Sequence, residues 1–265
     1  MADHSKMNLS LLEAKIASWG ARKLGRKAIK TDTRTLMLAN YLTPSLPAPP
    51  PAADWTRGIA SWGMMLNDKL GDCTIAGIGH AVQVWSANSC QEITVPDDAI
   101  LASYEQWDGY NPADPSTDQG GIELDVLTDF KANGLAGHKL LAFADAKAAN
   151  LVEVRQSIAL FGGVYIGVSL PLTAQSQDMW DVVPDDGSGS STAGSWGGHA
   201  VFVPAYDPDG FTCITWGAPK KMTTAFWRAY VDEAHALLSP DWLTAKGSPS
   251  GFDLQQLQQD LSVIK

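Results

Sequence analysis

Cys73 is the residue whose setting most directly suggests chemistry. It follows Gly71-Asp72 and opens a predicted helix, because the apolar residues of LGDCTIAGIGHAVQVW recur at helical spacing and Asp72 is a good N-cap. A thiol at a helix start feels the positive end of the helix dipole, which lowers its pKa and favours the thiolate. Most free cysteines only pack in a core. Cys73 is therefore a candidate nucleophile that needs a base beside it, whereas Cys90 and Cys213 lack such a setting.

His199 is the candidate base among the five histidines. It begins a predicted strand directly after a glycine- and serine-rich loop over residues 185–198, where a side chain can point into a cleft. His80 lies seven residues after Cys73, which is about 10.5 Å along a helix and beyond hydrogen-bonding reach. The alternative for His199 is a structural role at a strand end. The other three histidines are expected in an N-terminal tail, in a loop and on a late amphipathic helix: His4, His138 and His235.

The order of these residues resembles the papain family of cysteine peptidases. In that family a nucleophilic Cys at a helix start is followed by a distant His-Ala strand and then by Asn-Ser-Trp-Gly. The matching segments here are His199-Ala200-Val201 and Thr215-Trp216-Gly217. The resemblance covers about residues 53–243 and implies a fold of two lobes, a helical lobe carrying the Cys and an antiparallel β lobe carrying the His.

The resemblance also assigns roles to residues around the Cys-His pair. Asn67 stands six positions before Cys73, where the family has the Gln of its oxyanion hole. Gly120-Gly121 resembles the paired glycines that present backbone to a bound peptide. Trp216 is assigned to the same substrate-binding surface, where it would wall the histidine off from solvent. The implied catalytic set is Cys73, His199, Asn67 and Thr215.

Two departures from the family pattern affect the histidine. Ile214 occupies the position of the family's Asn and cannot orient an imidazole. Its neighbour Thr215 offers a hydroxyl, and Asp207 in the DPDG turn is the other candidate. Because the predicted hairpin HAVFVPAYDPDGFTCITW folds about that turn, Thr215 can lie beside His199, whereas Asp207 is about 25 Å away along the strand. We therefore predict that Thr215 or a backbone carbonyl is the partner of His199.

Three functions remain open at this point. The first is a thiol hydrolase that cleaves peptide or isopeptide bonds. The second is an inactive papain-like module that binds a peptide or protein partner, suggested by Ile214. The third is an acyl transferase of the transglutaminase or deamidase kind, which would use the same Cys-His pair. We predict a peptide or protein substrate and no cofactor, metal, nucleic acid or membrane.

The elements that must position these residues indicate an α+β protein. Helices are predicted first, over 73–85, 99–107, 123–134 and 150–163, and strands second, VYIGVSL followed by the hairpin. We expect a basic N-terminal helix, from Leu9 to Leu24, and a Pro-rich strap within residues 1–52. The papain-like domain would then span 53–243, with lobes at 53–150 and 151–243, and a tail or helix would span 244–265.

Charge is unevenly distributed along the chain. Residues 1–35 contain eight basic and three acidic residues, whereas the remainder has an excess of fifteen acidic residues. A basic arm on an acidic body is expected to dock on the body itself, across the two lobes, by an attraction that salt weakens. Three cysteines, none with CxxC spacing, and no recognisable signal peptide favour the cytoplasm or another reducing compartment.

Overall fold

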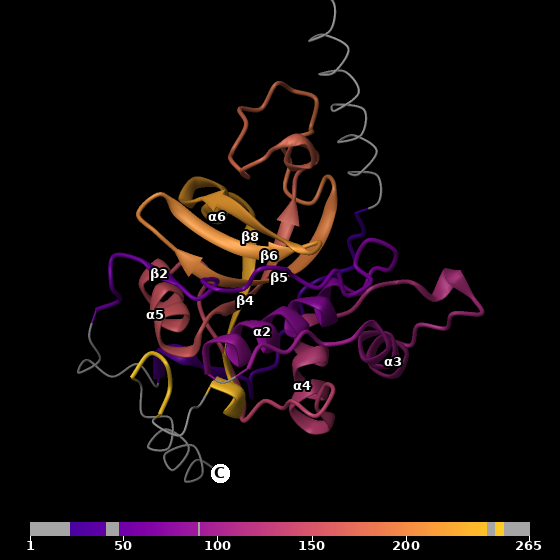
Figure 1. The fold of residues 1–265 in the computed structure, drawn as a ribbon. Coiled ribbons are helices and arrows are strands. Elements are labelled where there is room, and N and C mark those ends of the chain that lie inside the picture. The colour runs from indigo at the N-terminus through magenta and orange to yellow at the C-terminus, as the bar shows by residue number, and fades with distance from the viewer. Residues whose placement is uncertain (1–21, 41–47, 90, 243–246, 252–265) are drawn as a thin grey trace, which may run out of the picture.

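The computed structural model describes residues 22–40, 48–89, 91–242 and 247–251 (Figure 1). Most of the predicted helix over residues 9–24 and of the predicted segment over 244–265 lies outside the described residues, as does Cys90. The predicted α+β class and the arrangement in two lobes are confirmed. Helices α2, α3 and α4 gather on one side of the molecule and the strands on the other (Figure 1).

The helical lobe is built around α2 (Cys73–Ser89), with α3 (Asp97–Asp108) and α4 (Glu123–Asn133) beside it. Residues 73–86 of α2 are all buried, as expected for a helix enclosed on every side. Local signals set the ends of the other two helices. Both have acidic residues in the first turn, which complement the helix dipole, and both end at a glycine with positive φ, Gly109 or Gly134.

The β lobe is one mainly antiparallel sheet. Its strands, in order across the sheet, are β1 (Leu36–Met37), β3 (Ala142–Asp145), β8 (Val231–Leu238), β4 (Val164–Leu170), β5 (Gly197–Tyr206), β6 (Gly210–Thr215) and β7 (Ala218–Thr223), with β2 (Ala53–Asp54) paired to β5. Helices α5 (Leu151–Phe161) and α6 (Thr224–Tyr230) pack against this sheet. β2 and β3 come from before residue 151, so the sheet draws on both segments of the papain-like region.

The prediction of an amphipathic helix around His235 is wrong. Residues 231–238 form β8, which lies between β3 and β4 and is almost entirely buried. Strand pairing on both sides overrides the helical spacing of its apolar residues. The error matters because Glu233 and His235, two residues apart on a strand, then share one face.

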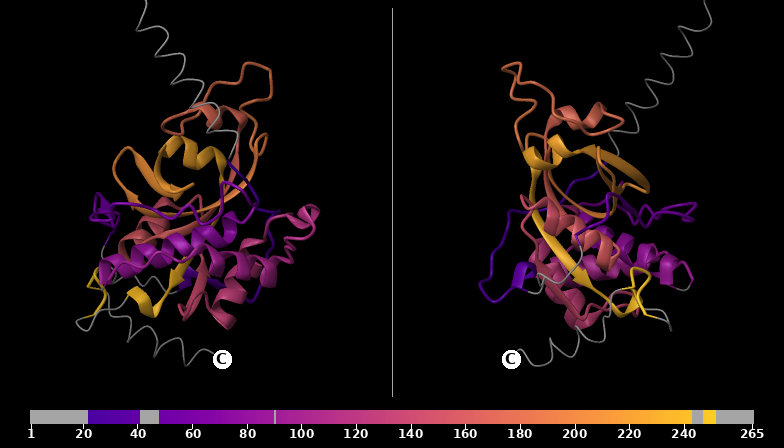
Figure 2. Two further views of the ribbon diagram at one scale, coloured as in Figure 1. Left: turned by 45° about the vertical axis from the view of Figure 1, so that its right-hand side comes forward. Right: turned by 90° about the vertical axis from the view of Figure 1, so that its left-hand side faces the viewer.

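The two lobes meet along α2 and β5. Tyr165 of β4 donates through its hydroxyl to the carbonyl of Thr74 at 2.8 Å, and Trp85 donates to the carbonyl of Phe161 at 2.9 Å. The first bond fixes the start of α2 against the sheet, and the second ties its C-terminal half to the end of α5. The segment between β4 and β5, by contrast, stands out from the body (Figure 2). Within the described part of the chain, no helix is long and apolar enough to cross a membrane.

Candidate active site

Cys73 is the first residue of α2, as predicted. The carbonyl of Asp72 accepts the first helical hydrogen bonds, from Ile75 and Ala76. The Sγ atom accepts from the backbone N–H of Ala200 at 3.4 Å, which places the thiol directly beside the strand that carries His199. The geometry therefore brings the candidate nucleophile and the candidate base together across the lobe interface.

The thiol is not activated in this state. Cys73 is 1% exposed, and burial raises its pKa to about 12, although N–H groups of Ala200 and Gly25 act in the opposite direction. The expectation that this pKa is lowered is thus wrong here, because burial disfavours the charged thiolate. Burial also raises the pKa of Cys213 to about 12, so the pKa does not separate the two described thiols.

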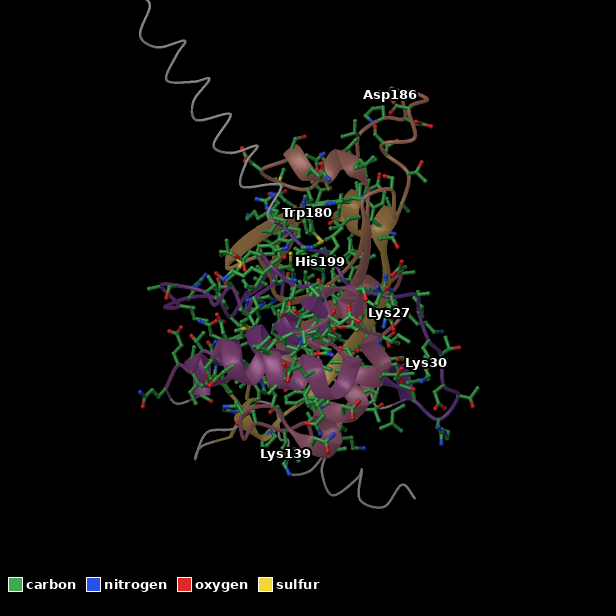
Figure 3. The ribbon with its side chains drawn as sticks, turned by 90° about the vertical axis from the view of Figure 1, so that its right-hand side faces the viewer. Lys27, Lys30, Lys139, Trp180, Asp186 and His199 are labelled. Atoms are coloured by element: carbon green, nitrogen blue, oxygen red, sulfur yellow. The ribbon has the colours of Figure 1, made fainter. Side chains whose placement is uncertain are left out.

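His199 is fully buried in the interior of the molecule (Figure 3). Its Nε2 lies 2.6 Å from Oγ1 of Thr215, and its ring stacks on Trp216 with a centroid separation of 4.5 Å. Nδ1 is buried and makes no hydrogen bond to any described residue. Burial, and to a smaller extent His80, lowers the pKa of His199 to about 3, which keeps the imidazole neutral. Asp207 instead binds Lys221 and the amides of its own turn.

Asn67 is buried close to Cys73, but its amide group is already engaged. The side-chain N–H₂ donates to the carbonyl of Leu70 at 3.3 Å and to Oδ1 of Asp72 at 3.1 Å. Met65 and Leu66, which precede it, have positive φ angles of 54° and 63°. Such a backbone costs about 1–2 kcal/mol per residue and recurs at functional sites. Asn67 is therefore held beside the site, and it must turn before it can serve an oxyanion.

Gly120 and Gly121 precede α4 in the helical lobe, and Gly121 lies against Thr74, the residue after Cys73: a Cβ atom at Gly121 would be 2.6 Å from Oγ1 of Thr74. The hydroxyl of Tyr104 accepts from the N–H of Gly120 and donates to Asp118, which also accepts from the N–H of Gly71. This network ties the paired glycines to the segment that leads into α2. Tyr104 and Asp118 were not predicted, because no local pattern marks residues that act through a network formed by folding.

The N-terminal arm passes through the site, between the two lobes. Gly25 accepts through its carbonyl from Gly121 at 2.8 Å, and the N–H of Lys27 donates to the carbonyl of Gly121 at 2.8 Å. On the opposite side, the N–H of Arg26 donates to the carbonyl of Gly198 at 3.1 Å. The expectation that the arm packs across the lobes is thus confirmed for residues 22–27.

The arm approaches the thiol and Trp216 most closely at two residues. The N–H of Gly25 points at Sγ of Cys73, so an amide and not a carbonyl faces the sulfur. The indole of Trp216 donates to the carbonyl of Lys23 at 3.1 Å, and Arg22 lies over the same ring. Beyond Trp216 the cleft continues as a pocket of about 410 Å³ lined in part by Thr215 and Lys220.

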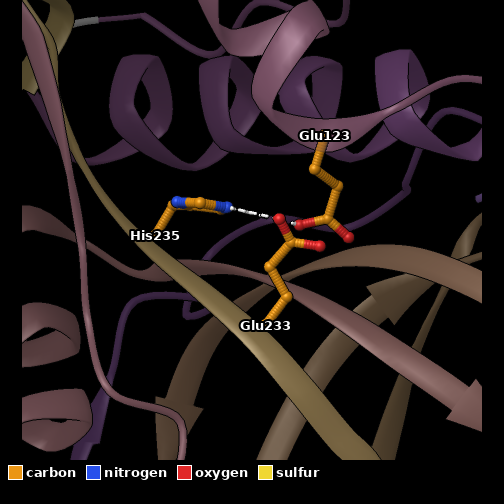
Figure 4. Close-up of side chains that lie close together, drawn as sticks. All are labelled: Glu123, Glu233 and His235. Carbon is orange, nitrogen blue, oxygen red and sulfur yellow. Dashed lines mark hydrogen bonds and ion pairs between the residues drawn. The ribbon is translucent and has the colours of Figure 1, made fainter. Parts of the chain in front are cut away.

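Three buried side chains resemble a metal site. Ligand atoms of Glu123, Glu233 and His235 lie within 4.8 Å of one another (Figure 4). The guanidinium of Arg26 already stands among them, 2.9 Å from Glu123 and 2.8 Å from Glu233. The cluster therefore holds an organic cation from the arm, and nothing in its geometry calls for a metal ion.

Comparison with known proteins defines the class of fold. No known family matches the sequence, and no curated protein does. Among solved structures, xylellain, a cysteine protease from Xylella fastidiosa, is similar with a TM-score of 0.62 and 15% identity, over 82% of this chain and 97% of xylellain. Procathepsin B S9 from Trypanosoma congolense has a TM-score of 0.55 and 9% identity, over 85% of this chain and 89% of its own. Procathepsin L 3 from the larval midgut of Tenebrio molitor has a TM-score of 0.55 and 12% identity. The similarity covers 85% of this chain and 78% of the procathepsin chain. The chain has the papain-like fold, in a divergent form.

Proposed function

We propose that this protein is a cysteine peptidase, or a related thiol hydrolase of peptide or isopeptide bonds, held in a latent state by residues 22–27. The observation that carries the proposal is the Cys73 thiol at a helix start, in hydrogen-bonding contact with the N–H of the residue after His199. The similar structures include two procathepsins, whose names denote precursor forms. A chain segment lying in the cleft fits such a form.

Catalysis follows from the groups in place. Once the arm leaves, Nδ1 of His199 takes the proton of the Cys73 thiol, and the sulfur attacks the carbonyl carbon of the substrate. The N–H of Cys73, together with the amide of Asn67 once it has turned, stabilises the oxyanion. The C–N bond then breaks, the amine leaves with the proton of His199, and water hydrolyses the thioester with His199 as base.

The arm resists cleavage because of its direction. It pairs in parallel with the segment at Gly121, and it presents the N–H of Gly25 to the sulfur. A nucleophile needs a carbonyl carbon at that point. The arm therefore occupies the cleft as an inhibitor and not as a substrate, and the neutral thiol and imidazole beneath it are protected from solvent.

The test displaces the arm without changing the site. A Cβ atom at residue 25 would lie 1.7 Å from the carbonyl oxygen of Gly71, so full-length Gly25→Val cannot keep the arm in place. We expect this variant to react with a peptidyl epoxide at Cys73 and to hydrolyse a fluorogenic peptide, whereas Gly25→Val/Cys73→Ala does neither. An inactive binding module would leave Cys73 of Gly25→Val unlabelled. Transfer of the acyl group to an added amine, in preference to water, would identify an acyl transferase.

A further inference from the structure

The side chain of Arg26 fills a buried acidic pocket beside the cleft. It is 3% exposed and forms three ion pairs: Nε with Glu123 at 2.9 Å, and Nη2 with Asp232 at 2.6 Å and Glu233 at 2.8 Å. Glu123 comes from the start of α4, whereas Glu233 comes from β8 (Figure 4), where Asp232 immediately precedes it. The pocket is therefore formed where the two lobes meet.

The pocket is shaped for the guanidinium that occupies it. Gly167 of β4 forms one wall, and a Cβ atom there would lie 2.2 Å from Nε of Arg26. The carboxylates contact two different nitrogens, which matches the planar fork of arginine and not the single ammonium of lysine. A glycine at 167 and acids on both lobes thus form a cavity whose size and charge suit one type of side chain.

The pocket keeps its negative charge without Arg26. In the part of the chain that the structure describes, a second cation, His235, places its Nε2 3.1 Å from Oε1 of Glu233. Burial lowers the pKa of His235, but its hydrogen bonds to Asp145 and Glu233 raise it to about 9. Burial and the neighbouring Glu233 raise the pKa of Glu123 to about 8, so at neutral pH one imidazolium stands against the carboxylates of Asp232 and Glu233. Buried carboxylates that lose their cation are strongly destabilised. An emptied pocket will therefore favour any ligand that brings a cation of the same shape.

The backbone of the arm shows where a substrate side chain would enter. Gly25 lies at the thiol, and Arg26, the next residue, is flanked by the two hydrogen bonds to Gly121 and extends into the pocket. A peptide paired with Gly121 in the same groove places its second residue from the thiol at the pocket mouth, because consecutive residues of an extended chain are about 3.3 Å apart. We propose that this acidic pocket selects substrates with arginine as the second residue on the acyl side of the cleaved bond. The proposal rests on the proposed function of the same cleft.

The test compares arginine with its neutral isostere. Full-length Gly25→Val is treated with acyl-side dipeptide probes that carry a thiol-reactive ketone, with glycine next to the ketone and arginine, citrulline or leucine at the second residue. We expect Cys73 to be labelled at least about tenfold faster by the arginine probe than by the citrulline probe, because hydrogen bonds between charged groups exceed neutral ones by about 1.4 kcal/mol or more.

A variant of the pocket identifies the cause of the preference. Glu233→Gln, in the Gly25→Val background, should reduce the preference for arginine to about twofold or less, because it removes the charged group that accepts a hydrogen bond from the guanidinium. Asp207→Asn is the matched control, since Asp207 is an acid on the hairpin turn that pairs with Lys221 and lies outside the pocket. It should leave the preference unchanged.

The outcomes separate this proposal from the proposed function. Equal labelling by all three probes would overturn the arginine pocket and leave the thiol hydrolase standing. If no probe labels Cys73, the hydrolase proposal fails, and the pocket is judged by titrating the same dipeptides, without the ketone, into Gly25→Val/Cys73→Ser. Tighter binding of arginine than of citrulline would then support the pocket, and equal binding would overturn it. If Gly25→Val does not fold, Lys23→Pro serves instead, because it removes the N–H that binds the carbonyl of Asn67 at 3.2 Å.

Discussion

Thr215 determines how strongly His199 can support a charge. A neutral hydroxyl at 2.6 Å from Nε2 orients the ring but stabilises an imidazolium less than an amide oxygen or a carboxylate does. The site is therefore expected to be a slow version of the papain-like arrangement. Trp216, stacked on the ring and held at a φ of 46°, adds orientation at the cost of backbone strain.

Replacing Thr215 tests whether its neutral hydroxyl limits the support that the His199 imidazolium receives. In the Gly25→Val background we expect Thr215→Asn to raise kcat/KM about tenfold and Thr215→Val to lower it about tenfold, which corresponds to a change of about one pKa unit in the Cys-His pair. The measurement is hydrolysis of a fluorogenic peptide, with melting temperatures to verify folding. Asp207→Ala should change activity little, and its loss of activity in a folded protein would contradict the assignment.

The raised pKa of the buried Asp72 side chain leads to a second prediction, which concerns how folding stability depends on pH. Burial raises its pKa to about 8, although the hydrogen bond from Asn67 opposes this. Between its ordinary pKa and this value, the folded protein keeps a proton that the unfolded chain releases. Folding stability therefore falls as pH rises through this window. Asp72→Asn has no proton to lose and can still accept from Asn67.

We expect the free energy of unfolding of Asp72→Asn, relative to the parent, to increase by at least about 1 kcal/mol from pH 5 to pH 8. Urea unfolding at the two pH values measures it. The control is Asp114→Asn: Asp114 is exposed, and hydrogen bonds from Ser116 lower its pKa, so it is ionised throughout this range. A relative stability of Asp72→Asn that is constant or falls with pH would show that Asp72 is ionised in the folded protein.

At the scale of elements, the arm is held by two kinds of charge contact. Lys30 and Asp125 are half-exposed and 2.5 Å apart, and salt screens such a pair. The pairs of Arg26 are buried and are screened far less. The sequence, which gives only the excess of charge on arm and body, predicts a salt-sensitive arm, whereas the structure indicates that burial makes it resistant.

The alkylation rate of Cys73 measures how often the arm leaves. In the unmodified protein we expect that rate to change less than about twofold when NaCl is raised from about 0.1 M to about 1 M, because screening acts on the exposed pairs only. Gly25→Val should raise it by at least about a hundredfold at either salt concentration, since steric exclusion does not depend on charge. A steep increase of the parent's rate with salt would mean that the exposed lysines hold the arm.

The elements that the sequence predicted well are those with local signals. The end of α4 near Gly134 and strand β4 over Val164–Leu170 coincide with the structure, because glycines and β-branched runs act within a few residues. The start of α2 at Cys73 also coincides, although the side chain of Asp72 accepts from Asn67 and not from the helix. β8 was predicted as a helix because its environment, two neighbouring strands, is not visible locally. The pairing of Thr215 with His199 could be predicted only because one hairpin joins them.

The acidic pocket could not be predicted from the sequence for a related reason. Arg26 is one of several basic residues in the arm, and its partners Glu123 and Glu233 lie far from it along the chain. Each of the three belongs to a different segment, and only folding brings them together. The excess of basic residues in the arm and of acidic residues in the body correctly predicted that the arm packs on the body. It did not reveal which arginine of the arm is buried.

At the scale of the whole molecule, Arg26 joins the lobes. Its guanidinium binds Glu123 of the helical lobe and Asp232 and Glu233 of the β lobe at once, and its backbone bonds to Gly198. The arm is thus a third component of the fold, because any change that releases it also removes a cation from between the lobes.

Replacing Arg26 should therefore destabilise the whole protein. We expect Arg26→Ala to lower the free energy of unfolding by about 3 kcal/mol, because removing one partner of a buried charge pair leaves the other uncompensated. Arg34→Ala is the control on the same arm: Arg34 is exposed and pairs with Asp32 at 2.5 Å, and losing such an exposed ion pair changes stability little. Denaturant unfolding of the full-length variants at neutral pH provides the comparison. Equal stabilities of the two variants would mean that the lobes hold together without Arg26. A large loss confined to Arg26→Ala, accompanied by faster alkylation of Cys73, would tie the stability of the fold to the closed state of its cleft.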